Sequence, residues 1–306
     1  MGIVLPYFYV SSRGDGISIV LIYTLIENFK MMKSYFRQVK RVLIIAAISI
    51  GIAACSKNSI TGRSQLALLP ESELRSMAAS EYQQFLSQNK VLSPSSSKDA
   101  EMVRRVGARL ATSIIKYYST KGLSTELEGY KWEYNLVDSK DVNAWAMPGG
   151  KIVVYTGLLP VTQNEAALAV VLGHEITHAL AHHGNERMSQ QMVAQGIGVV
   201  GGVLTSGNQQ VSSIFNNVYG PGASVGVLLP NSRKQELEAD HYGLIFTAMA
   251  GYNPREAIPL WERMKAMSNG NRPPEFLSTH PAEDTRIEKL KEMMPEALKY
   301  YKPMGK

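Results

Sequence analysis

The chain has very little cysteine for its 306 residues, and its six histidines are unevenly placed. Cys55 is its one cysteine, so no internal disulfide can form. All six histidines lie in the second half, and four of them fall between His174 and His183. The metal-binding and acid–base chemistry of histidine is therefore concentrated in one short stretch.

The sequence also lacks a long hydrophobic run and a strong excess of one charge. The apolar stretch Val42–Ala54 has 13 residues, whereas a membrane-spanning helix needs about 20. The net charge is +6, but residues 1–54 hold six Lys or Arg against two Asp or Glu and so carry +4 of it. The remaining +2 gives no basis for a nucleic-acid partner.

The motif His-Glu-Ile-Thr-His at residues 174–178 is the strongest chemical signal. Helical residues four apart lie about 6 Å apart along the axis on one face, so both imidazoles can reach one zinc ion. Glu175 flanks that ion without binding it and can take a proton from a zinc-bound water, whose pKa zinc lowers to about 7. We expect Thr162 and Glu165 to form the capping box of this helix, and Ala166–Leu172 is an apolar, helix-forming run.

Two histidines are too few for a catalytic zinc site, which needs three protein ligands. A histidine six residues after His178 would define one class of zinc peptidase, but that position is Gly184, so the class is excluded. His182 lies about 12 Å along the helix axis from His174, too far to share one ion with the pair. We interpret His182 and His183 as polar residues of the last helical turn, with Gly184 as its cap.

A second predicted helix, at residues 232–249, offers carboxylates at a suitable spacing. Glu236 and Asp240 share a face, whereas Glu238 is rotated by about 200° from Glu236. We predict Glu236 as the third ligand and Asp240 as the acceptor of a ligand histidine N–H. Gly243 follows on the same face, where a missing side chain lets two helices pack closely. The alternative is an ordinary solvated helix face.

Five segments carry a resemblance to a known family: His174-Glu-x-x-His178, Ser-Arg-x-x-Glu236-x-x-x-Asp240, Asn143–Gly150 with the following Lys151–Leu159, Thr279-His280-Pro281 with Arg286 beyond it, and Thr61–Leu66. They resemble the gluzincin zinc metalloproteases that include the CAAX prenyl proteases and the Oma-type peptidases, peptidase family M forty-eight, and within it the bacterial envelope lipoproteins. The ordered set runs from about residue 60 to about residue 290 and is more specific than any single motif.

The resemblance implies one Zn²⁺ per chain, bound by His174, His178 and Glu236, with Glu175 as the catalytic base. It also implies that His280 lies near the metal, as a fourth, inhibitory ligand or as a catalytic residue that stabilises the transition state. From the residues alone, His280 can equally be a loop histidine before a proline. Arg286 either stabilises an oxyanion or pairs with a carboxylate in the core.

Helical periodicity predicts a mainly α (α+β) fold with a small sheet. The resemblance implies that this fold is a zincin-type catalytic domain with an active-site helix and a second metal-ligand helix. Further helices are expected at Leu74–Gln88, Ala100–Tyr118, Arg255–Met267 and Ala282–Tyr300, and strands at Tyr130–Leu136 and Lys151–Tyr155. The strand before the metal helix is expected at the sheet edge, where an extended substrate can add by backbone pairing. The glycine-broken segment Met188–Pro230 is expected to form a helix and a lid, with a core helix and a polar loop as the alternative.

The N-terminal residues have the features of a bacterial lipoprotein leader. Basic residues at 37–41 precede the apolar run, and Ile-Ala-Ala-Cys at 52–55 resembles a lipobox. The resemblance implies cleavage before Cys55 and lipidation of its thiol and new amino group; the alternative is a cysteine that happens to close an apolar run. Ser56 at the next position is similar to lipoproteins of the outer membrane.

These features predict four parts: residues 1–31 as an overlong start, 32–54 as a lipoprotein signal peptide, 55–98 as a lipid-anchored segment with the first helix, and 99–306 as the zinc metallopeptidase domain. The predicted function is a zinc-dependent endopeptidase, anchored in the bacterial outer membrane through Cys55 and facing the periplasm. Its expected substrates are unfolded or misassembled envelope proteins. The alternatives are a chaperone-like envelope protein with a structural or autoinhibited zinc site and a zinc hydrolase of a non-peptide substrate.

Overall fold

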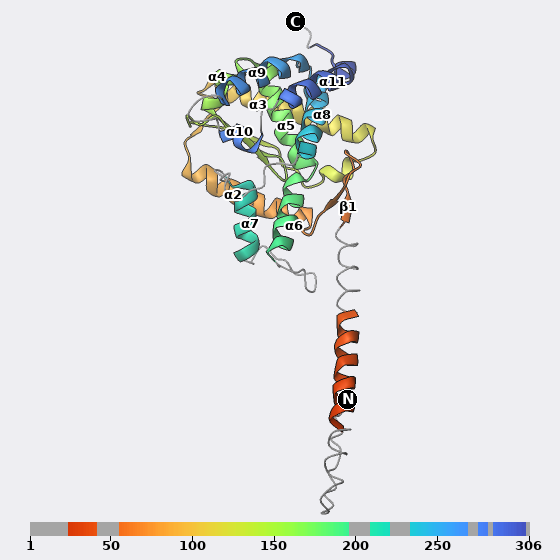
Figure 1. Cartoon of the computed structure of the whole chain (residues 1–306). Coiled ribbons are helices and arrows are strands. Elements are labelled where there is room, and N and C mark those ends of the chain that lie inside the picture. The colour runs from red at the N-terminus through yellow and green to blue at the C-terminus, as the bar shows by residue number, and fades with distance from the viewer. Residues whose placement is uncertain are drawn as a thin grey trace, which may run out of the picture. The chain divides into compact units, whose positions relative to one another are not determined.

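The computed structural model of the chain describes residues 24–41, 55–195, 209–220, 233–268, 275–280 and 284–303 (Figure 1). The chain divides into two compact units, Met1–Ala54 and Cys55–Lys306. In the first unit residues 24–41 form a helix, while the predicted apolar run and the lipobox residues before Cys55 lie outside the described residues. None of the helices in the described ranges is both long enough and apolar enough to cross a membrane.

The second unit is mainly helical with small sheets, which confirms the predicted fold class. Its helices are α2 (Glu71–Gln88), α3 (Lys98–Thr120), α4 (Leu159–Thr162), α5 (Glu165–Leu180), α6 (His183–Ala194), α7 (Gln209–Tyr219), α8 (Arg233–Met249), α9 (Ala257–Ser268), α10 (Glu275–Thr279) and α11 (Asp284–Tyr300). Short 3-10 turns occupy Ser124–Leu127, Thr156–Leu158 and Pro254–Glu256. The strands are β1 (Cys55–Lys57), β2 (Ser64–Leu66), β3 (Val91–Leu92), β4 (Glu133–Val137), β5 (Ala144–Met147) and β6 (Lys151–Tyr155).

Helix α5 is the central element of this unit (Figure 1). It packs against α8, α3 and the strand β5. Every residue from Ala167 to Leu180 is buried. A helix that is covered on all sides has to be apolar all round, which explains why its few polar side chains stand out as candidates for function.

The four-stranded sheet has the order β3-β4-β6-β5, with β6 parallel to β4 and antiparallel to β5. The strand that precedes α5 is therefore an inner strand, and the prediction that it lies at the edge is wrong. Its five residues are all buried, as expected of a strand with a neighbour on each side. β5 takes the edge because the chain turns back through Gly149 and Gly150, whose φ of +83° favours glycine.

The N-terminus of α5 is capped by Asn164 rather than by the predicted pair of Thr162 and Glu165. Asn164 Oδ1 accepts the backbone N–H of Ala167 at 2.8 Å. The Thr162 hydroxyl instead donates to the carbonyl of Leu159, inside the short helix α4. The prediction of the cap is wrong because Thr162 ends one helix before the next one begins.

Two glycines allow α5 and α8 to pack closely. A Cβ on Gly173 would lie 2.8 Å from the carbonyl oxygen of Gly243, and a Cβ on Gly243 would lie 2.9 Å from the backbone nitrogen of His174. Real Cβ atoms do not approach backbone so closely. The predicted role of Gly243 in close helix packing is therefore confirmed.

A left-handed residue joins α5 to α6. His182 has a φ of +55° and precedes α6, which begins at His183. The predicted last-turn positions of His182 and His183, with Gly184 as the cap, are therefore wrong. Gly184 lies inside α6, where any side chain would collide with Tyr219.

The segment predicted to form a helix and a lid is helical where it is described. α6 runs to Ala194, and α7 packs on it with an apolar face that includes Val211 and Phe215. The rest of the segment, residues 196–208 and 221–230, lies outside the described residues. The lid remains a prediction.

An N-terminal hairpin of β1 and β2 is attached to the end of α5. Asn58 Oδ1 accepts the backbone N–H groups of Ile60 and Thr61 at 3.1 and 3.0 Å, which stabilises the turn. Asn58 Nδ2 donates to the carbonyl of Leu180 at 3.2 Å. This bond satisfies one of the carbonyl groups that a helix leaves unpaired at its C-terminus.

Candidate metal centre

Four buried side chains with metal-binding atoms converge in the second unit. His174 and His178 project from α5, Glu236 from α8, and His280 follows α10 directly. Their candidate ligand atoms all lie within 4.8 Å of one another, and we call these four side chains the donor group, meaning donors to a metal ion. The structure thus brings together the three predicted ligands and His280.

The distances between these atoms suit one tetrahedral ion. Nε2 of His174 lies 3.0 Å from Nε2 of His178 and 3.2 Å from Nδ1 of His280. The carboxylate of Glu236 lies 3.4, 3.3 and 3.0 Å from the same three nitrogen atoms. A tetrahedral zinc ion with bonds of about 2.0–2.1 Å separates its ligands by about 3.3 Å. The nitrogen and oxygen donors are also types that zinc accepts.

Asp240 fixes the ring of His174. Its Oδ1 lies 2.9 Å from Nδ1 of His174, which leaves Nε2 directed at the other donors. Arg286 from α11 donates to both oxygen atoms of Asp240 at 2.8 Å, and its Nη1 lies 2.8 Å from Oε2 of Glu236. The guanidinium also stacks 3.6 Å from the centre of the Trp261 ring. Of the two roles predicted for Arg286, the structure shows the pairing with buried carboxylates.

Glu175 is buried beside the donor group without being part of it. Its Oε1 lies 3.4 Å from Nε2 of His280 and has no hydrogen-bond partner within the described residues. Burial raises the pKa of the Glu175 carboxyl. An oxygen atom in this position can accept a proton from a reactant held at the donor group.

The protonation states of Glu236 and His178 favour a cation, whereas that of His174 opposes one. Burial alone would raise the pKa of Glu236, but the charges of His280 and Arg286 hold it well below its usual range, so Glu236 is an anion. Burial lowers the pKa of His178, which keeps its lone pair available. For His174, the hydrogen bonds to Asp240 and Glu236 outweigh burial and raise the pKa to about 9. A metal ion therefore has to displace a proton from His174.

Sequence reasoning missed a second network, which lies behind His178. Nδ1 of His183 is 2.8 Å from Nδ1 of His178, and Nε2 of His183 is 3.0 Å from Oε2 of Glu238. Glu238 in turn accepts from Nε of Arg63 at 2.8 Å. The sequence held one signal for this network, Arg63 in the Thr61–Leu66 motif, for which no partner was predicted.

The other histidines outside this network, and Cys55, lie outside the donor group. Nδ1 of His182 is 2.6 Å from Oε1 of Glu71, so the prediction that His182 does not share the ion is confirmed. His241 Nε2 lies 2.9 Å from Glu296 Oε2. Cys55 is the first residue of β1.

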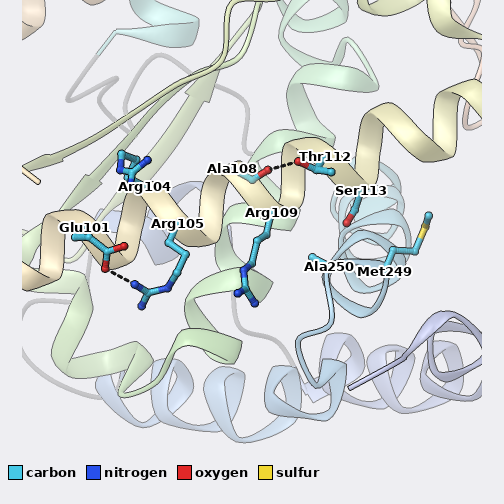
Figure 2. Close-up of a pocket in the computed structure, with 9 residues that line it drawn as sticks. All are labelled: Glu101, Arg104, Arg105, Ala108, Arg109, Thr112, Ser113, Met249 and Ala250. Atoms are coloured by element: carbon cyan, nitrogen blue, oxygen red, sulfur yellow. Dashed lines mark hydrogen bonds and ion pairs between the residues drawn. The ribbon is translucent and has the colours of Figure 1, made fainter. Parts of the chain in front are cut away.

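A surface groove of about 670 Å³ runs along α3 near the end of α8 and shares no residue with the metal centre (Figure 2). Arg105, which lines it, is paired with Glu101 and Glu165. Arg109 lies over the ring of Tyr252, with Cζ 5.9 Å from its centre. The residues that line this groove include one carboxylate, Glu101, and no histidine, so we assign the chemistry to the metal centre.

The mainly helical fold and the four buried donors define a zincin-like domain. Residues 98–294 match Peptidase family M48. The chain therefore belongs to peptidase family M48, whose metalloproteases use zinc. The predicted family and the predicted cofactor, one zinc ion per chain, are confirmed.

Three relatives illustrate the similarity. Mitochondrial metalloendopeptidase OMA1 of Saccharomyces cerevisiae is 36% identical over 182 residues, which cover 57% of this chain and 50% of the relative. Metalloendopeptidase OMA1, mitochondrial, of Bos taurus is 32% identical over 250 residues, or 78% and 46% of the two chains. Beta-barrel assembly-enhancing protease of Escherichia coli is 26% identical over 163 residues, or 51% and 33%. The chain spans half or less of the length of each relative.

Proposed function

We propose that this chain is a zinc-dependent endopeptidase in which His174, His178 and Glu236 hold the ion and Glu175 is the base. The observation that carries the proposal is the buried Glu175 carboxylate beside four donors whose spacing suits one ion. Membership of this family and the similarity to metalloendopeptidases and a protease support the reaction class.

Each residue near the donors has a distinct part in this proposal. Zinc, when bound, supplies a Lewis acid that polarises a carbonyl and acidifies a water molecule. Glu175 takes the proton that is lost during attack on the peptide carbonyl and later gives it to the leaving amine. Asp240 keeps the ring of His174 in one orientation, and Arg286 pairs both with Asp240 and with the ligand Glu236.

The position of His280 decides whether the site is open. Its Nδ1 is as close to His174 and Glu236 as a fourth ligand would be, whereas a hydrolytic zinc site keeps the fourth position for the reactant. We therefore propose that His280 is an inhibitory ligand in this arrangement and has to move before reaction. His280→Ala should then raise the rate of peptide cleavage. A fall in rate of about 10²–10³-fold would instead assign it to transition-state stabilisation.

An extended substrate is proposed to pair with the edge strand β5. Backbone groups along an edge strand are available to an added strand, and recognition of this kind leaves side-chain specificity broad. β5 also packs against α5, which carries the catalytic motif. A proline placed at Ala146, against an alanine-to-serine control at the same position, should weaken peptide binding if this strand is the docking edge.

The proposed place of action is the bacterial envelope, with the chain attached to the outer membrane through a lipid on Cys55 and facing the periplasm. The lipobox-like sequence before Cys55 supports the anchor. The substrates that we propose are unfolded or misassembled envelope proteins, and the similarity to a beta-barrel assembly-enhancing protease of Escherichia coli is consistent with this class.

Metabolic labelling with a fatty acid tests the lipid anchor, and the label should be lost in Cys55→Ser. Label retained in the variant would contradict it.

The experiment that tests the proposed function measures zinc content and casein cleavage for the full-length chain beside Glu175→Gln. Zinc retained in both proteins with cleavage lost only in Glu175→Gln is the expected result. Glu296→Gln, which changes a surface carboxylate, is the matched control and should cleave like the parent. A parent chain that binds no zinc would overturn the ligand assignment.

A chaperone-like protein with a structural zinc site is the second candidate. Its support is the closed set of four protein donors, since structural zinc sites have four protein ligands. This candidate predicts zinc in the parent and in His280→Ala, no cleavage by either, and suppression of the aggregation of an unfolded protein that survives in Glu175→Gln. Cleavage by His280→Ala would exclude it.

A further inference from the structure

His183 is a buried histidine whose two ring nitrogens are both engaged, next to the metal donors but not one of them. Its exposed fraction is 0%, its Nδ1 lies 2.8 Å from Nδ1 of His178, and its Nε2 lies 3.0 Å from Oε2 of Glu238. The two imidazole rings meet nearly edge-on, with centres 4.9 Å apart and planes at 71°. A hydrogen bond between two Nδ1 atoms requires that one carries a proton and the other does not.

Glu238 and the ligand role of His178 together determine which of the two atoms carries it. A carboxylate only accepts, so Nε2 of His183 bears a proton. As a ligand, His178 keeps the lone pair of its Nε2 and carries its own proton on Nδ1. Nδ1 of His178 therefore donates this hydrogen bond, and Nδ1 of His183 accepts it. The lone pair on Nε2 of His178, which faces His174, stays available to bind a metal ion.

We propose that His183 and Glu238 are positioning residues of the metal centre, which fix the tautomer and the ring direction of His178. The inference rests on the proposed function, because it takes His178 as a zinc ligand. Partners of this kind orient a ligand ring and raise its basicity. His174 has its equivalent partner in Asp240, but His178 reaches its carboxylate through a second imidazole.

The N-terminal hairpin completes the network. Nε of Arg63 donates to both oxygen atoms of Glu238 at 2.8 and 3.0 Å, and its two terminal nitrogens each donate to Glu186 at 2.7 Å. Arg63 thus holds two partly buried carboxylates with one rigid fork. A continuous set of hydrogen bonds therefore joins the segment that begins at Cys55 to His178.

Zinc affinity is the first measurement, made on the full-length chain by competition with a chromophoric chelator. His183→Phe keeps a ring but removes both nitrogens, whereas His183→Gln keeps an acceptor. We expect His183→Phe to weaken zinc binding about 10–100-fold and His183→Gln to restore most of the loss. His241→Phe is the matched control, because His241 Nε2 also meets a carboxylate at 2.9 Å but lies outside the donor group. It should bind zinc like the parent.

Two results of this comparison would overturn the inference. One is a His183→Phe chain with the zinc affinity of the parent. The other is a His183→Gln chain as weak as His183→Phe, which would mean that the ring fills space and its acceptor is irrelevant. The thermal midpoint of each chain in excess chelator shows whether a variant has simply lost its fold. If His183→Phe has lost its fold, the comparison of His183→Gln with the parent still tests the inference.

Nitrogen NMR of the zinc-loaded chain gives a readout that a space-filling role would not produce. Imidazole ¹⁵N shifts separate the Nδ1–H form from the Nε2–H form. We expect His183 in the Nε2–H form and His178 with its proton on Nδ1. A His183 ring protonated on Nδ1, or on both nitrogens, would overturn the proton assignment.

His178→Ala separates failure of this inference from failure of the proposed function. If His178→Ala binds zinc as tightly as the parent, His178 is not a ligand and the proposed ligand set is wrong. If His178→Ala loses zinc while His183→Phe retains it, the ligand set stands and the positioning role is refuted.

Discussion

Replacing Gly243 by alanine tests how closely the two ligand-bearing helices have to pack. A Cβ at this position would lie 2.9 Å from the backbone nitrogen of His174 and 3.0 Å from the carbonyl carbon of Gly173. Both are backbone atoms, so no side-chain rotation relieves the contact. α8 therefore has to move away from α5 at the level of His174, about one turn from Asp240 and two turns from Glu236.

The size of the effect follows from these distances. Non-bonded heavy atoms prefer separations of about 3.5 Å, so the helices should part by roughly 0.5 Å. Metal sites tolerate ligand displacements of only about 0.2 Å. The alanine gains at most about 1 kcal/mol of helix propensity, whereas overpacking a core costs about 1–3 kcal/mol. We expect the overpacking to dominate and the thermal midpoint to fall by about 3–6 °C for a unit of this size.

Two assays check this prediction: thermal unfolding in excess chelator, and zinc affinity by chelator competition. Gly243→Ala should unfold at a lower temperature and bind zinc at least about tenfold more weakly than the parent. Lys234→Ala, at an exposed position of the same helix, should change neither quantity. Parental zinc affinity in Gly243→Ala would refute the argument that the α5–α8 spacing sets the donor geometry.

Two further predictions concern stability away from the ion. Asn164→Ala removes the cap of α5 and should lower the free energy of unfolding by about 1 kcal/mol in urea titrations; an unchanged value would contradict the cap assignment. Arg63→Met leaves Glu186 without its cation and should cost about 3–5 kcal/mol at neutral pH. Burial raises the pKa of Glu186, but bonds from Arg63 and Gln235 outweigh burial and hold it below its ordinary 4.5. This stabilisation is present above pH 4.5 and lost as the pH falls through the lower folded pKa, so the difference between parent and variant should shrink in acid. A difference that stays constant into acid would argue against the pairing.

The local part of the candidate site could be predicted because it depends on helix geometry alone. His174 and His178 share a face by their spacing, and so do Glu236 and Asp240 on the second helix. The structure places these pairs as the periodicity predicted. Gly243 was found in the same way, because a residue without a side chain on a ligand-bearing face implies close packing.

The features of the fold and site that could not be predicted depend on where helices are interrupted and on which strands pair. The pairing of His183 with His178 depends on the left-handed conformation of His182, which interrupts the helix between them. In a continuous helix a residue five positions further on would lie about 140° around the axis. The inner position of β6 depends on a parallel partner, β4, which precedes β5 in the chain, so it follows from how the strands pair and not from the turn between β5 and β6. Thr162 and Asn164 are both plausible caps, and only the short helix α4 decides between them.

Asp240 and Arg286 allow a last prediction, in which a double-mutant cycle separates support of a ligand from stability of the core. Asp240→Asn replaces the carboxylate partner of His174 by a weaker, neutral acceptor and should reduce zinc affinity about 10–100-fold. It also removes a negative charge that pairs with the buried Arg286, so the zinc-free chain should lose about 3–5 kcal/mol of unfolding free energy. Adding Arg286→Met removes a cation that has lost its Asp240 partner but still contacts Glu236, so the free energy of unfolding should recover only in part. Zinc affinity should not recover, because His174 still lacks its carboxylate. Urea titration and chelator competition measure the two quantities separately, and recovery of zinc affinity in the double variant would show that Asp240 acts through Arg286 rather than through His174.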